Sequence, residues 1–254
     1  MDVSEKRITS LPKLPQGLRG LNCSNTNITQ LPELPSSLKT LICNGTQITE
    51  LPKLPPKLEV LECGATHLTC LPELPSSLQK LRCDMTLIKE LPELPDEIRS
   101  LSCNDTLLTE LPRLPKMLKT LNCSKTPIVR LPELPERLTY LDCYDTPITS
   151  LPELPDSLRI LICSVTRITC LPELPQKLGC LICHGTPLVL PMKYRERISE
   201  YNERWRTYRE EQACKERTQQ RCRSLQAELE ATTWSPCRIE KLIETYGIEI
   251  LETL

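Results

Sequence analysis

The chain has 254 residues, including 24 prolines, 7 glycines and no phenylalanine, and only 3% of its residues are aromatic. This composition excludes a globular core built around aromatic side chains. The formal net charge is -1, so no long-range field would recruit nucleic acid or an anionic membrane. No apolar run is long enough to span a membrane, and Met1 is not followed by the apolar stretch of a secretory signal, so we expect a soluble cytoplasmic protein.

The sequence repeats every 20 residues from about Leu11 to Leu190, with the pattern LPxLPxxLxxLxCxxTxITx and no insertion or deletion. The residues before Leu11 fill half a repeat, with Val3 at the cysteine position and Ile8 at the isoleucine position. We therefore expect a repeat array over residues 1–190, a half repeat followed by nine full ones. In this interpretation the chain begins inside the array, with no separate N-terminal cap and an exposed first edge.

Each repeat predicts a short strand followed by an extended return. Leu21 and Cys23 are two positions apart, so their side chains share one face of a strand. Equivalent strands would stack as a parallel sheet, about 4.8 Å apart, with a buried ladder of cysteines from Cys23 to Cys183. The prolines exclude a helix or central strand on the way back, so the return should be polyproline-like. The expected fold is an α/β solenoid with a C-terminal α-helical segment.

This pattern resembles the leucine-rich repeat, LxxLxLxxNxL, in its shortest form with an LPxLP return, which is similar to the repeats of bacterial effector proteins. The resemblance covers about residues 1–190. Cysteine replaces the last strand leucine, and threonine replaces the asparagine of the turn. We expect Thr26 and its equivalents to hydrogen-bond with the turn backbone instead.

The strand residues on either side of the buried leucine should point to the concave, solvent-facing side of the sheet and vary between repeats. Exposed apolar groups beside tyrosines are typical of binding surfaces. Covering of these groups by the C-terminal segment is an equal alternative. The predicted partner-binding residues are Lys80, Arg82, Tyr140, Asp142, Tyr144, Asp145, Ile160 and Ile162.

Two cysteine motifs are candidate reactive sites. Bacterial effectors with similar repeats can carry a ubiquitin-ligase domain with a CxD nucleophile, and CxD occurs at Cys103 and Cys143. Both are ladder positions, where a buried thiol is unreactive. Cys180 and Cys183 match CxxC, but on a strand they face opposite sides. We therefore expect reduced thiols in a reducing compartment, no metal, no cofactor and no enzymatic activity.

The C-terminal segment, residues 191–254, changes to helical periodicity, with Tyr194, Ile198, Tyr201, Trp205 and Tyr208 on one face. This helix should continue, with a break, through Cys214 and Cys222 to Leu229. Ser235 and Pro236 predict the start of a short second helix. The stretch Thr233–Leu242 resembles a C-terminal motif of proteins from large DNA viruses of amoebae, although Ser235 and Leu242 depart from it.

The leading hypothesis is a protein–protein interaction scaffold that holds a protein partner, for example a host protein, on the concave face. It predicts no binding of nucleic acid or membrane. The alternatives are an adaptor or effector linked to ubiquitin transfer, for which Cys214 and Cys222 are the helical candidates, and a structural array that self-associates. A virus or an intracellular pathogen is the expected source, and the sequence leaves the oligomeric state open.

Overall fold

The computed structural model describes residues 1–191 and 197–233, with side chains to Ser224. The chain divides into two compact units, Met1–Asn202 and Glu203–Leu254. We call the first unit the array body. The domain boundary expected at residue 190 stays a prediction. The first helical residues after it belong to the same compact unit as the repeats.

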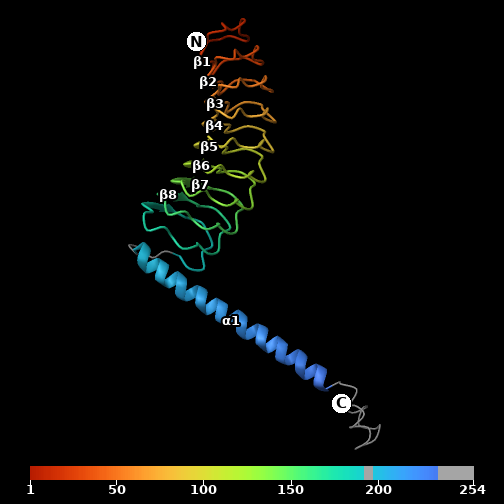
Figure 1. The fold of residues 1–254 in the computed structure, drawn as a ribbon, viewed down its shortest axis with the longest axis vertical. Coiled ribbons are helices and arrows are strands. Elements are labelled where there is room, and N and C mark those ends of the chain that lie inside the picture. Colours follow the sequence, from red (N-terminus) through yellow and green to blue (C-terminus); the bar gives the residue numbers. More distant parts are fainter. Residues whose placement is uncertain (192–196, 234–254) are drawn as a thin grey trace, which may run out of the picture. The chain divides into compact units, whose positions relative to one another are not determined.

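The array body is a parallel β-solenoid in which each 20-residue repeat adds one rung (Figure 1). Neighbouring strands pair in register with their equivalents 20 residues away, for example Leu21 with Leu41. This confirms the predicted solenoid of stacked parallel strands. The sheet has nine strands in sequence order, β1 Gly20–Asn22, β2 Thr40–Ile42, β3 Val60–Glu62, β4 Lys80–Arg82, β5 Ser100–Ser102, β6 Thr120–Asn122, β7 Tyr140–Asp142, β8 Ile160–Ile162 and β9 Cys180–Ile182.

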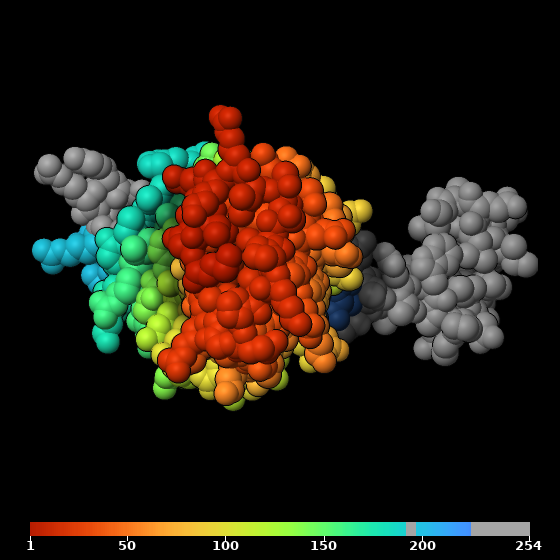
Figure 2. All heavy atoms as spheres, turned by 90° about the horizontal axis from the view of Figure 1, so that it is seen from above, coloured from red at the N-terminus to blue at the C-terminus, as the bar shows by residue number. Residues whose placement is uncertain are grey.

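Leucine and cysteine fill the interior of each rung. The central leucine of a strand is buried, as are the cysteine that follows it and the isoleucine of the turn; Leu41, Cys43 and Ile48 are all 0% exposed. Because a three-residue strand buries these side chains only against its neighbours, successive rungs stabilise one another. The first repeats fill the cross-section at the end where the chain begins (Figure 2).

The cysteine ladder is held by backbone carbonyls of the next strand. The thiol of Cys143 donates a weak hydrogen bond to the carbonyl of Ile162, with Sγ and O 3.4 Å apart, and the amide of Cys143 donates to the same oxygen. Five further ladder cysteines repeat the thiol bond. The expectation of a buried ladder is wrong at Cys183, which is half-exposed because no further rung in the described chain covers it.

A sharp turn follows each strand. The hydroxyl of Thr26 donates to the carbonyl of Cys23 at 2.7 Å, and the equivalent threonines of the following repeats do the same, so each threonine bonds within its own repeat. The residue before each threonine has a positive φ. Glycine suits that conformation at Gly45, but Val165, with φ of 56°, is a β-branched residue in a region that such residues rarely occupy.

The return path is extended except for one tight turn in each repeat. The amide of Leu18 donates to the carbonyl of Pro15 at 3.0 Å, and equivalent bonds recur in every later repeat. The half repeat at the start also forms a rung, because Asp2 pairs with Asn22 in parallel and Val3 donates to the carbonyl of Asn22. Residues 1–5 therefore extend the ladder beyond β1.

Helix α1, Ile198–Thr233, begins in the array body, and its residues from Glu203 onward belong to the second unit. It runs without the predicted break. Its first turn docks on the last repeat: Tyr201 is 0% exposed, and Asn202 accepts from the amide of Leu174 at 2.8 Å and donates to its carbonyl at 2.7 Å. The apolar helix face is therefore confirmed at Tyr201. Tyr194, the predicted second helix and the virus-like motif, apart from Thr233, lie outside the described residues.

Candidate functional site

The open face of the sheet carries the residues predicted to bind a partner. We define the open face by three positions in each repeat. Two are the strand residues on either side of the buried leucine, and the third is the residue directly after the ladder cysteine. In the first repeat these are positions 20, 22 and 24. The strand residues are half-exposed in almost every rung while the leucine between them is buried. Because the register is fixed, equivalent residues form straight rows along the stack.

Lys80 and Arg82 are engaged within the array. The Nζ of Lys80 lies 2.6 Å from Oε1 of Glu62, and the Nε of Arg82 lies 2.5 Å from Oδ2 of Asp84. Burial raises the pKa of Glu62, but hydrogen bonds from Lys80 and Asn44 outweigh it and hold that pKa below its ordinary value. Lys80 and Arg82, both predicted to bind a partner, are thus paired with two carboxylates.

Asp84 links two neighbouring rungs, those of β4 and β5. Its side chain is buried and, besides Arg82, accepts hydrogen bonds from the hydroxyl of Ser102 at 2.5 Å and from the amide of Asn104 at 3.1 Å. A carboxylate can be buried where hydrogen bonds compensate its charge. The middle of the open face is therefore a closed polar network, and its groups are already occupied.

Tyr140, Asp142 and Tyr144 form a second group, on and just after β7. The hydroxyl of Tyr140 donates to Oδ2 of Asp142 at 3.3 Å, and the amide of Tyr144 donates to Oδ1 of Asp142 at 3.0 Å. Burial and then the charge of Asp142 raise the pKa of Tyr140. Asp145 is exposed in the turn, with φ of 53°, and is not part of a strand.

Ile160 and Ile162 continue this group onto β8. Ile160 pairs with Tyr140 on one side and with Cys180 on the other, and Ile162 pairs with Asp142 and Ile182. All these side chains are half-exposed. The structure thus brings the predicted residues of β7 and β8 together, but β4 lies three rungs away, about 14 Å along the stack. The open face has two separate groups rather than one site.

The CxD cysteines are not placed for catalysis. Cys103 and Cys143 are 0% exposed, and burial raises the pKa of both thiols well above the ordinary value. A nucleophilic cysteine needs a lowered pKa and access to substrate. The exposed thiols of the described chain are elsewhere, at Cys70, Cys214 and Cys222.

Apolar side chains in the turns after β4 and β5 were missed by the sequence analysis. Met85 is 58% exposed, Leu87 48% and Leu107 45%. The residue equivalent to Leu87 is polar or proline in the other repeats apart from Leu107, which was the available signal. Leucine at this position in two neighbouring repeats makes the turns after β4 and β5 more apolar than the equivalent turns of the other repeats.

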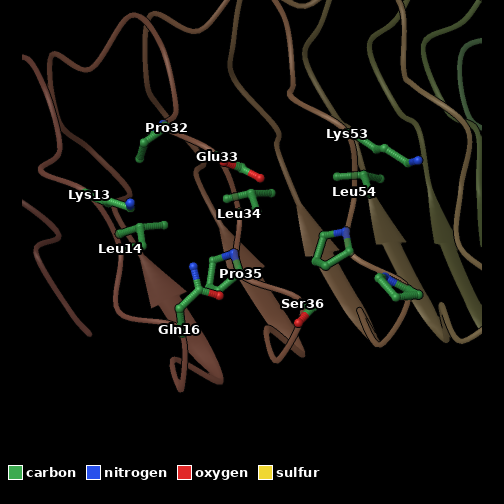
Figure 3. A pocket seen from close by; sticks show the side chains of 12 residues that line it. Lys13, Leu14, Gln16, Pro32, Glu33, Leu34, Pro35, Ser36, Lys53 and Leu54 are labelled. Carbon is green, nitrogen blue, oxygen red and sulfur yellow. The ribbon is translucent and has the colours of Figure 1, made fainter.

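The return path carries shallow grooves. One, of about 600 Å³, runs over the first three repeats, where Leu14, Leu34 and Leu54 lie in a row beside the charged Lys13 and Glu33 (Figure 3). A second groove, of about 710 Å³, lies over later repeats and includes Leu94 and Leu114. Because the same LPxLP geometry produces both, these grooves are a general feature of the return path.

Residues 1–191 and 197–233 contain neither a candidate metal site nor a candidate membrane span. In that part of the chain no group of three or more His, Cys, Asp or Glu side chains is arranged to hold a metal ion. Likewise, none of the helices described there has the length and apolar character needed to cross a membrane.

Several solved structures are similar to this chain. YopM from Yersinia enterocolitica is 36% identical, with a TM-score of 0.68, over 73% of this chain and 46% of YopM. The LRR domain of a Shigella effector is 31% identical, with a TM-score of 0.51, over 59% of this chain and 70% of that domain. The functional domain of InlJ from Listeria monocytogenes, which includes a cysteine ladder, shares the fold at 23% identity and a TM-score of 0.52, over 76% of this chain and 54% of that domain.

The aligned part of this chain spans less than half of the length of YopM. No protein-family model and no curated protein matches the chain. The similarity to known proteins therefore rests on the solved structures.

Proposed function

Because the chain belongs to the leucine-rich repeat proteins, we propose that it is a non-enzymatic scaffold that binds a protein partner on the open face of its sheet. The observation that carries this proposal is the group on β7 to β9. There Tyr140, Ile160, Ile162 and Ile182 remain half-exposed in adjacent rungs. Tyrosine and clustered aliphatic side chains are typical of the residues that dominate protein interfaces.

The chemistry of the cysteines supports a scaffold over an enzyme. The two CxD cysteines are buried, so a role in packing explains them better than a role as nucleophiles. The proposal includes a reducing compartment such as a cytoplasm, because the cysteines of the described chain are free thiols. A host protein is the proposed partner, by analogy with the bacterial effectors that the repeats resemble.

Affinity capture with matched variants tests the proposal. The intact chain is compared with a face variant, Tyr140→Ala, Tyr144→Ala and Ile162→Asp, and with a control variant, Val129→Asp and Glu133→Ala. Val129 and Glu133 are exposed outside the open face. Circular dichroism first establishes that all three fold alike.

We expect one protein to be retained by the intact chain and the control variant and to be lost with the face variant. The same protein, once identified and purified, should bind the intact chain directly. Equal retention by all three would place the binding surface elsewhere and contradict the proposal.

A further inference from the structure

A row of cations borders the open face. The residue immediately before each strand is basic in five repeats, and we call the row formed by Arg19, Lys39, Arg99, Lys119 and Arg159 the basic margin. Backbone hydrogen bonds fix its spacing, because the amide of Lys119 donates to the carbonyl of Arg99 and the amide of Arg159 to that of Thr139, each across one rung.

The cations of the margin near β5 to β8 are available to a partner. Arg99, Lys119 and Arg159 are exposed, and their side chains form no ion pair with any residue in the described part of the chain. Lys39, by contrast, pairs with Glu59 at 2.6 Å. Three positive charges therefore remain unpaired beside the group of Tyr140, Ile160 and Ile162.

The carboxylates of the open-face strands and of Asp84 are already satisfied. Glu62 accepts from Lys80 and Asn44, Asp84 accepts from Arg82 and Ser102, and Asp142 accepts from Tyr140 and from the amide of Tyr144. Among the described residues, Glu62 and Asp84 form ion pairs with Lys80 and Arg82, whereas Asp142 keeps its charge. Beside the group of Tyr140, Ile160 and Ile162, the three cations of the margin therefore outnumber this one open-face carboxylate.

We infer that the basic margin recruits an acidic polypeptide segment, whose carboxylates pair with Arg99, Lys119 and Arg159 while an adjacent apolar side chain packs against Tyr140, Ile160 and Ile162. This inference rests on the proposed function and names the chemistry of the partner. Complementary charge around an apolar contact sets orientation and specificity at interfaces.

The spacing of the cations favours a peptide over a nucleic acid. Arg99 and Lys119 are one rung apart, about 5 Å, and Arg159 is two rungs beyond Lys119. A strand of nucleic acid would bring a continuous phosphate charge over the neighbouring carboxylates of Asp84 and Asp142. A peptide can place a few carboxylates at the margin and an apolar residue on the isoleucines.

Fluorescence anisotropy with defined probes tests the inference. The probe is a labelled peptide of glutamates around a central pair of leucines, compared with the same peptide carrying lysines and with a single-stranded oligouridine. The margin variant is Arg99→Glu, Lys119→Glu and Arg159→Glu. The control variant, Lys89→Glu, Arg113→Glu and Arg130→Glu, makes the same change of charge at exposed residues away from the margin.

We expect the acidic peptide to bind the intact chain and the control alike, more weakly as salt is added, and the margin variant to bind at least about tenfold more weakly. Equal binding by the margin and control variants, or preference for the lysine peptide or the oligouridine, would overturn the inference. If a protein captured through the open face binds the margin variant normally but not the face variant, the scaffold proposal stands and only the acidic partner is wrong.

Discussion

Alkaline pH should unfold the array because its ladder of thiols is buried. Burial raises the pKa of Cys23 to about 11 and of Cys123 and Cys163 to about 12, from an ordinary value of 9.0. The folded chain therefore keeps protons that the unfolded chain releases. The stabilising contribution of each thiol is complete below about pH 9 and is lost as the pH rises toward its folded-state pKa.

The magnitude follows from the number of thiols. At about pH 10, ionisation of one thiol favours the unfolded chain by about 1.4 kcal/mol. Eight ladder thiols would together contribute about 11 kcal/mol, which is comparable with the whole stability of an ordinary domain. These thiols, each 0% exposed, belong to Cys23, Cys43, Cys63, Cys83, Cys103, Cys123, Cys143 and Cys163.

Urea unfolding followed by circular dichroism at about pH 7.5, 8.5 and 9.5, with a reductant present, measures this effect. We expect the midpoint to change little over the first step and to fall steeply over the second. A double variant, Cys103→Ala and Cys123→Ala, should be less stable at neutral pH but lose about a quarter less stability with rising pH. An unchanged midpoint at the highest pH would refute the reasoning.

Three substitutions test individual contacts. Thr106→Val, which removes the buried hydroxyl bonded to the carbonyl of Cys103, should cost about 1–3 kcal/mol of unfolding free energy in urea, whereas Thr109→Val, at an exposed position, should cost almost nothing. Val165→Gly should raise the unfolding free energy by about 1 kcal/mol, because glycine adopts the positive φ of this position without strain. Val129 is similarly exposed but has no positive φ, so Val129→Gly should not raise the unfolding free energy. Asn202→Ala should speed hydrogen exchange at the amide of Leu174 by tenfold or more, because that amide loses its acceptor. A tenfold change corresponds to about 1.4 kcal/mol in the free energy of local opening.

Each of these has a contrary result. Equal costs for the two threonine substitutions would mean that the turn hydroxyls add nothing to stability. A loss of stability in Val165→Gly as large as in Val129→Gly would show that the turn is not strained. Unchanged exchange at Leu174 in Asn202→Ala would mean that the helix does not hold the last repeat.

The period made most of the fold predictable. A strict 20-residue repeat with leucine and cysteine two apart determines strand position, register and the buried side of every rung, and β1 to β9 lie where that pattern places them. The periodicity places the half repeat at the start in the array, but it does not predict how the end rungs pair or how exposed they are. Cys183 is half-exposed because it lacks a neighbouring rung, and the rung formed by residues 1–5 depends on the pairing of Asp2 with Asn22.

The candidate site was less predictable because side-chain pairing crosses rungs. Lys80 and Arg82 are two positions apart on one strand and suggest a basic surface. Glu62, one rung before them, pairs with Lys80, and Asp84, just after the strand, pairs with Arg82. Arg99, Lys119 and Arg159 of the basic margin show the opposite: these cations look ordinary in the sequence but have no carboxylate partner among the described residues. Whether a cation is paired depends on where side chains of neighbouring rungs lie in space, which the sequence does not give.

Photocrosslinking tests the central claim, that the open face is the binding surface, most directly. A photoreactive phenylalanine analogue replaces Tyr140 on the open face or, in a matched sample, Glu153 on the exposed return path, and each sample is irradiated with the captured partner. The account predicts a covalent adduct from position 140 and none from position 153. An adduct from position 153 alone would contradict it and place the partner on the return path.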